Sequence, residues 1–225
     1  MLADAADHCA YVSSRSVYRP PLPAGMHEDS PVLPAAPDAV DGDYGECKAG
    51  GESAAGTYFA GRLLVARVGL LLGPYEDVGR LPWWPARMAR GGDVLAPGPP
   101  DLPLQYLDSR DAAAWLVTAA ADQLTGVFNV VSAPGHTTMH ELLTCCVEVT
   151  GNDATLRWTA PAAVLAAGVQ PWSQLPIWVP PGHPLRAMHE TDTSRARSAG
   201  LRCRPVRNTV ADVWQWLCAG GHRAR

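Results

Sequence analysis

Residues 62–72 read RLLVARVGLLL, and a Gly-Pro pair at 73–74 closes the run. An apolar stretch bounded by turn residues is typical of a strand that is buried on both faces of a parallel sheet. Residues 9–14, CAYVSS, form a second short apolar run, which ends in two serines. A helix is predicted between them, over residues 44–59. The order strand, helix, strand therefore predicts an α/β fold with a parallel sheet.

Further elements are expected on both sides of this unit. Residues 19–43 contain repeated prolines and predict a long loop, and residues 171–184 predict a second one. Thr138 and Glu141 match a capping box, in which each side chain satisfies a backbone N–H at a helix start. Asp108 and Asp111 orient the end of the sheet or cap the helix that follows them, and a cap is favoured. The sequence predicts strands at 104–107, 126–131 and 156–158, and helices at 83–90, 110–121, 138–150, 161–167 and 210–218.

The composition limits the class of protein. The chain has 225 residues, of which 47% are hydrophobic and 18% charged, and its formal net charge is -4. This balance is typical of a globular protein rather than a disordered or membrane one, and no basic run favours a nucleic acid as partner. The N-terminus lacks the pattern of a secretory signal. Six cysteines without paired metal-ligand spacing indicate reduced thiols, so a cytoplasmic location is expected.

Two other groups of residues could form a metal site or a pocket. His136 and His140 are four residues apart and can face one metal, but the capping box already explains this segment, so no metal site is predicted. Four tryptophans lie beside prolines and either line a pocket or cover a core. Burial of large aromatic side chains favours core cover. These are Trp83, Trp84, Trp172 and Trp178.

Lys48 is the only lysine in the chain, and it follows Tyr44 by four residues. On a helix this spacing puts both side chains on one face, where a single ligand can touch both. An ammonium group stabilises a nearby phenolate, so Tyr44 can exchange a proton with a hydroxyl or carbonyl group of a substrate. A serine at the end of the first strand would hydrogen-bond the same oxygen. The alternative is an ordinary pair of side chains on a helix surface.

Five segments together resemble the extended or atypical short-chain dehydrogenase/reductases, the NAD-dependent epimerase/dehydratase family. The resemblance covers nearly the whole chain and preserves the order of the family's motifs. The segments are YVSSRSVY at 11–18, YGECK at 44–48, RLLVARVGLLLGPYE at 62–76, residues 85–117, and FNVVSAPGHTTMHELL at 128–143.

The resemblance implies a role for each matching residue. Tyr44 would be the catalytic acid/base, Lys48 would tune it and hold the nicotinamide ribose, and Ser14 would orient the substrate. Residues 68–73 match the loop that passes the nicotinamide, with Val68, Gly69 and Leu70 as cofactor contacts. Many relatives have asparagine where Leu70 stands, so only backbone contacts carry over at that position. Substrate contacts are expected in the segment of Trp83, Arg87 and Arg90.

The implied fold is the C-terminal part of a Rossmann-like parallel sheet plus a small α+β substrate lobe. Residues 1–74 would form the catalytic part, and residues 75–225 the lobe with returning sheet elements. The implied activity is NAD- or NADP-dependent oxidoreduction, epimerisation or dehydration of a sugar nucleotide or small polar metabolite, and a homodimer is compatible with it. Two alternatives are a non-catalytic family member that binds RNA and a nonfunctional gene remnant.

One family feature has no counterpart in the sequence. Dinucleotide-binding folds begin with a strand, a glycine-rich turn and a helix that receives the pyrophosphate. No Gly-x-Gly-x-x-Gly or related run occurs in that context, and Gly50-Gly51 lies inside the predicted catalytic helix. Met1 would then precede the fifth strand of the sheet, with roughly a hundred residues missing. We expect this chain to bind NAD(P) weakly or not at all.

Overall fold

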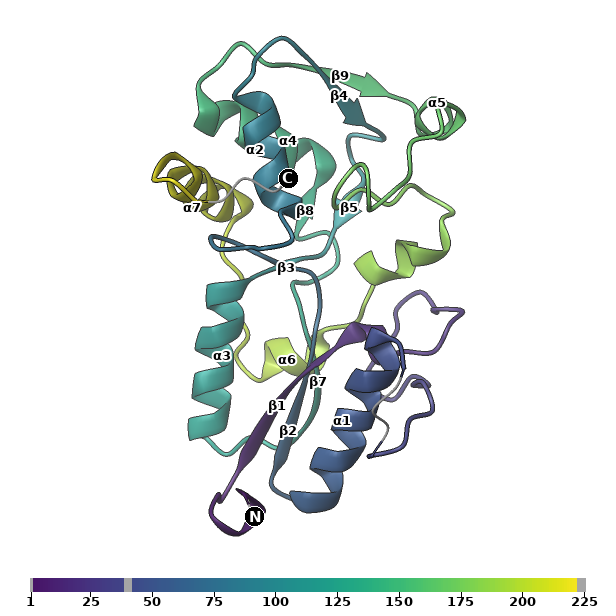
Figure 1. Ribbon diagram of the computed structural model, residues 1–225, viewed down its shortest axis with the longest axis vertical. Helices are drawn as coiled ribbons and strands as arrows, with labels where there is room; N and C mark the ends of the chain where they lie inside the picture. Colours follow the sequence, from purple (N-terminus) through teal and green to yellow (C-terminus); the bar gives the residue numbers. More distant parts are fainter. Residues whose placement is uncertain (1, 39–41, 222–225) are drawn as a thin grey trace.

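A three-stranded parallel sheet organises one half of the molecule (Figure 1). The computed structural model describes residues 2–38 and 42–221. The strands are β1 (Cys9–Ser14), β2 (Leu63–Val68) and β7 (Gly126–Val130), with β2 in the centre. Ser14 pairs with Val68, and Val68 pairs with Val130. The carboxyl ends of all three strands therefore meet at one edge, and the predicted parallel α/β fold is confirmed.

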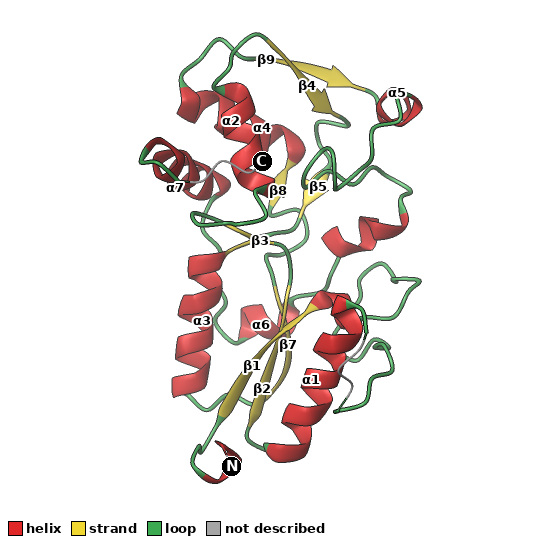
Figure 2. Cartoon of the chain, in the orientation of Figure 1, coloured by secondary structure: helices red, strands yellow, loops and turns green. Residues whose placement is uncertain are grey.

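Helices cover both faces of this sheet (Figure 2). Helix α1 (Tyr44–Tyr58) packs on β1 and β2, while α3 (Ser109–Ala121) and α6 (Ser194–Ser198) cover the opposite face. Leu64, Ala66 and Val68 alternate along β2 and pack in one apolar cluster with Trp115 of α3. This alternation follows from the two-residue period of a strand.

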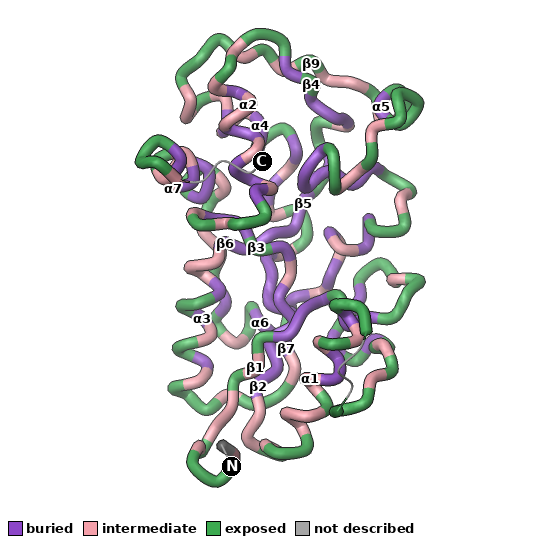
Figure 3. The backbone as a smooth tube through the Cα atoms, viewed as in Figure 1, coloured by how far each residue is buried: buried purple, intermediate pink, exposed green. Residues whose placement is uncertain are grey.

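The other half of the molecule is built around three helices, α2 (Arg80–Met88), α4 (Met139–Thr150) and α7 (Val206–Cys218). Their shared core contains Trp84, Trp178 and Met139, all fully buried. The short strands β3 (Leu71–Leu72) and β6 (Leu107–Asp108) pair between the two halves, where Figure 3 shows buried backbone at the centre of the molecule. The remaining pairs are β4 with β9 and β5 with β8.

The short elements have the following bounds: β3 (Leu71–Leu72), β4 (Asp93–Pro97), β5 (Pro103–Leu104), β6 (Leu107–Asp108), β8 (Thr137–Thr138), β9 (Thr155–Thr159), α5 (Pro161–Ala166), and the 3-10 helices η1 (Leu2–Asp4), η2 (Arg15–Val17) and η3 (Pro184–His189).

Most predicted elements are present, with shifted ends. The capping box of Thr138 and Glu141 starts α4 as predicted, and Asp108 caps α3 by accepting from the N–H of Arg110. The run at 62–72 divides into β2 and β3, because the chain leaves the three-stranded sheet after Val68. Leu70 O then accepts a hydrogen bond from the N–H of Leu107. The run at 104–107 likewise divides into β5 and β6. Helix α2 begins three residues before its predicted start, and strand β4 was not predicted.

The long loop, the cysteines and the candidate metal ligands can be compared with the structure in turn. The predicted loop at 19–43 contains no helix or strand over residues 19–38, apart from a bridge of Tyr18 with Val32, and residues 39–41 lie outside the described part. All six cysteines are free thiols. Within the described residues, no three His, Cys, Asp or Glu side chains gather as metal ligands. No helix in this part of the chain has both the length and the apolar character needed to span a bilayer.

Candidate active site

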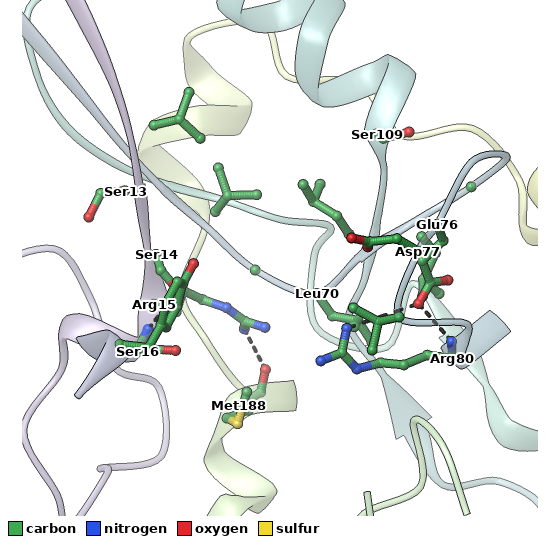
Figure 4. A pocket seen from close by; sticks show the side chains of 18 of the residues that line it. Ser13, Ser14, Arg15, Ser16, Leu70, Glu76, Asp77, Arg80, Ser109 and Met188 are labelled. Carbon is green, nitrogen blue, oxygen red and sulfur yellow. Dashed lines mark hydrogen bonds and ion pairs between the residues drawn. The ribbon is translucent and has the colours of Figure 1, made fainter. Parts of the chain in front are cut away.

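A cavity of about 640 Å³ opens at the carboxyl ends of β1 and β2 (Figure 4). Open α/β folds bind ligands at this edge of the sheet, because the loops that leave the strands diverge there. Ser14, Tyr44 and Lys48 all line the cavity, together with Val68, Gly69 and Leu70. The structure thus brings together the three predicted catalytic residues and the three predicted cofactor contacts.

The start of α1 presents Tyr44 and Lys48 to the cavity. Asp43 and Glu46 form a capping box that fixes the first turn of the helix. Lys48 Nζ donates to the backbone oxygen of Val12 at 3.0 Å and lies 5.9 Å from the centre of the Tyr44 ring. Tyr44 is 62% exposed. The ammonium and the phenol therefore share one helix face, as the spacing predicts.

Ser14 stands at the tip of β1, where the strand passes into η2. Its Oγ accepts a hydrogen bond from the backbone N–H of Ser16 at 3.1 Å. The hydroxyl proton of Ser14 has no acceptor among the described residues, so it is free to donate to a ligand oxygen. The neighbouring Ser13 donates instead to Glu52 of α1 at 2.5 Å, which links β1 to α1.

Gly45 lets α1 approach the tip of β1. A Cβ at this position would lie 2.4 Å from the backbone oxygen of Ser16 and 2.8 Å from a methyl carbon of Leu33. The clash with Ser16 involves backbone, so a side-chain rotation cannot relieve it. The absence of a side chain at residue 45 therefore lets the start of α1 lie against η2, directly after Ser14.

Gly45→Ala is expected to lower the free energy of unfolding by about 1–3 kcal/mol, because it overpacks this contact. Gly56→Ala in the same helix is the control. A Cβ there meets nothing within 4 Å, so the change is expected to stabilise by up to about 1 kcal/mol. Urea unfolding of both variants measures the difference. Equal stabilities would show that residue 45 makes no close contact.

Residues 68–70 cross the floor of the cavity between β2 and β3. The N–H of Gly69 donates to Val130 O at 3.1 Å, and Leu70 O accepts from the N–H of Leu107 at 2.8 Å. The Leu70 side chain is buried and supplies no polar group. A Cβ at Gly69 would lie 2.8 Å from the guanidinium carbon of Arg15, so glycine makes room for that side chain.

The three predicted substrate residues do not line the cavity. Arg87 donates to the backbone oxygens of Gly91, at 3.1 Å, and Asp93. Trp83 packs edge-on against Trp84 at the core of the other half. Arg90, at the end of α2, is likewise outside the cavity. The core cover favoured for the tryptophans is confirmed for Trp84 and Trp178, both fully buried.

Two other residues, from α2 and from the proline-rich loop, line the cavity instead. Arg80 of α2 stacks on Trp172, with its guanidinium carbon 5.3 Å from the ring centre, and both side chains line the cavity. Glu76 accepts from the N–H groups of Arg80 and Leu81, at 2.7 and 3.1 Å. Burial raises the pKa of Glu76 against the opposing effect of these bonds. No motif or spacing in the sequence pointed to Arg80. Trp172 lies in a proline-rich loop, and the sequence allowed it either to line a pocket or to cover a core.

No family model and no curated protein sequence matches the chain. Solved structures do match. UDP-glucuronic acid 4-epimerase from Bacillus cereus, in complex with NAD, is 16% identical with a TM-score of 0.59, over 97% of this chain and 65% of that one. UDP-N-acetylglucosamine 4-epimerase from Bacillus cereus is 17% identical with a TM-score of 0.61, over 94% and 65%. RMD from Pseudomonas aeruginosa, complexed with NADPH, is 15% identical with a TM-score of 0.63, over 93% and 66%.

These matches establish the fold. The chain has the Rossmann-like α/β fold of these proteins, and it spans 65 to 66% of their length.

Proposed function

We propose that the chain belongs to the NAD-dependent epimerase/dehydratase group of the extended short-chain dehydrogenase/reductases. Its reaction would be NAD(P)-dependent oxidoreduction or epimerisation at a hydroxyl or carbonyl carbon of a sugar nucleotide. The observation that carries this proposal is the meeting of Ser14, Tyr44 and Lys48 in one cavity. The likeness to epimerases solved with NAD and to a protein solved with NADPH supports it.

The residues of the cavity fit the nicotinamide end of such a cofactor. Lys48 stands one helical turn beyond Tyr44, where a bound ribose can reach both side chains. Gly69 and Leu70 present a stretch of backbone without a bulky polar side chain. For the pyrophosphate, the described residues contain no glycine-rich turn between a strand and a helix start. The fit is therefore to the nicotinamide and its ribose.

In this proposal Ser14 donates its free proton to the substrate oxygen and orients it toward Tyr44. Tyr44 Oη takes the proton of a substrate hydroxyl during oxidation and returns it to the carbonyl oxygen during reduction. The Lys48 ammonium, 5.9 Å from the centre of the Tyr44 ring, would hold the ribose hydroxyls beside Tyr44. When bound, the nicotinamide supplies the acceptor or donor of the hydride that leaves or joins the carbon.

The direct test supplies NAD or NADP in excess, because the pyrophosphate site is not represented in the described residues. The chain is incubated with each cofactor and a panel of UDP- and dTDP-hexoses. We expect one combination to form reduced nicotinamide, seen by absorbance, or a new sugar, seen by NMR. Failure of every combination to give either product would contradict the proposal.

A further inference from the structure

Arg15 follows Ser14 directly and lines the same cavity, yet only 3% of it is exposed. Its Nη1 donates to Met188 O, to Thr191 Oγ1 at 2.7 Å and to Gln105 Oε1 at 3.5 Å, all uncharged acceptors. Its Nε is buried without a hydrogen-bond partner. Nη2 also has none within residues 2–38 and 42–221. Figure 4 shows the side chain extending from the tip of β1 toward Met188, on the side that faces Leu70 and Arg80.

The charge of Arg15 is not neutralised by the described part of the chain, in which it forms no ion pair. The carboxylate of Glu76, on the opposite wall, is engaged by the backbone at the start of α2. Burial lowers the pKa of Arg15 to about 10, so it remains a cation at neutral pH. A buried cation without a carboxylate is unfavourable unless a bound anion completes the site.

The residues behind Arg15 add to the positive potential. Arg186 is buried, and its nearest carboxylate, on Glu190, is 3.7 Å away and half-exposed. His189 is near enough to both cations for their charges to act on it: its burial, together with these charges, lowers its pKa to about 3, so the imidazole is neutral and adds no charge. The charges of Arg15 and Arg186 therefore favour an anion on the side of the cavity that Arg15 lines.

The backbone also makes space for this guanidinium. A Cβ at Gly69 would lie 2.8 Å from both Cζ and Nε of Arg15 and 2.7 Å from a methyl carbon of Val131. Arg15 is thus enclosed by the segment expected to pass the nicotinamide on one side and by Met188 and Thr191 on the other. Of its two nitrogens without a partner within the described ranges, Nε is enclosed, and Nη2 is the one that can meet a ligand in the cavity beside Ser14.

We propose that Arg15 binds a carboxylate carried by the sugar ring, so that the site selects an acidic sugar nucleotide over a neutral one. This inference rests on the proposed function, since Ser14 marks where the reacting carbon lies. A carboxylate on the ring would lie near a guanidinium next to Ser14 and would accept charge-assisted hydrogen bonds from Nη2. The diphosphate of the same substrate lies farther from the reacting carbon.

The test measures binding by calorimetry, with no cofactor and no turnover, for UDP-glucuronate, UDP-glucose and UDP alone. The parent chain is expected to bind UDP-glucuronate roughly 10-fold or more tightly than UDP-glucose. Arg15→Gln is expected to abolish this ratio while affinity for UDP-glucose stays the same. Arg15→Lys is expected to retain part of the preference for UDP-glucuronate over UDP-glucose, because it keeps the positive charge. Arg80→Gln, in the same cavity, changes both affinities by the same factor.

Several results would overturn the inference. One is equal affinity of the parent chain for UDP-glucuronate and UDP-glucose. Another is an equal loss of affinity for UDP and for UDP-glucuronate in Arg15→Gln, which would assign Arg15 to the diphosphate. Absence of binding by both sugar nucleotides also counts against it. If Arg15→Gln fails to fold, the inference is still tested by the preference of the parent chain for UDP-glucuronate over UDP-glucose and by the same preference in Arg15→Lys. Since no step requires hydride transfer, an inactive chain that shows the ratio would contradict only the proposed function.

Discussion

Tyr44→Phe is expected to reduce conversion of the sugar nucleotide by about 10²- to 10⁴-fold, the usual contribution of a positioned acid or base. The ring stays in place, so ligand affinity is expected to change by less than about twofold. The exposed position of Tyr44 at the start of α1 makes a loss of folding an unsuitable explanation for such a result. Turnover is followed by absorbance of reduced nicotinamide, and binding by calorimetry.

Tyr58→Phe is the matched control for this experiment. Tyr58 is the last residue of the same helix, is 55% exposed and lies outside the cavity. Its variant should convert substrate at the parent rate. A Tyr44→Phe protein that retains more than about a tenth of parent turnover would remove Tyr44 from the role of proton carrier.

The parts of the fold predicted from sequence are those that local patterns determine. The apolar runs at 9–14 and 62–68 have the composition of strands, and the capping box of Thr138 and Glu141 depends on residues three apart. The first run is not the buried strand that its composition predicts, because β1 lies at the edge of the sheet and only Ser13 and Ser14 are buried. The division of 62–72 into two strands was missed because it depends on a distant partner. Leu70 O bonds to Leu107 N, and that pairing diverts the chain after Val68.

The residues of the candidate site also fall into those that local patterns predict and those that they do not. Tyr44 and Lys48 are related by helix periodicity, and Ser14 by the end of a strand, so sequence spacing was enough to propose them. Arg15 and Thr191 are 176 residues apart, and no local pattern links them. Arg80 and Trp172 also meet only through the packing of the second half of the molecule. Local periodicity therefore reveals the groups proposed to react, while the groups proposed to recognise a ligand come together only through tertiary contacts.

Glu52→Gln is expected to destabilise the protein by about 3–5 kcal/mol, the usual effect of removing one partner from a buried ion pair. Glu52 of α1 accepts from Nε and Nη2 of Arg67 on β2, at 3.0 and 2.7 Å, and both side chains are almost buried. Burial alone would lower the pKa of Arg67, but Glu52 and Tyr18 together outweigh it and hold that pKa above its ordinary value. The variant leaves the guanidinium charged with no carboxylate beside it. Urea unfolding measures the loss.

Glu148→Gln supplies the control, because Glu148 pairs with Arg207 on the surface, where 62% of the arginine side chain and 45% of the glutamate side chain are exposed. Such a pair contributes about 0–1 kcal/mol. Equal effects of the two substitutions would contradict the argument. The double variant Glu52→Gln/Arg67→Met should be more stable than Glu52→Gln alone, since it removes the stranded charge as well. Glu52 also accepts from Ser13, the neighbour of Ser14, so the same loss should loosen α1 from the strand tip and separate Tyr44 from the serine it is proposed to work with.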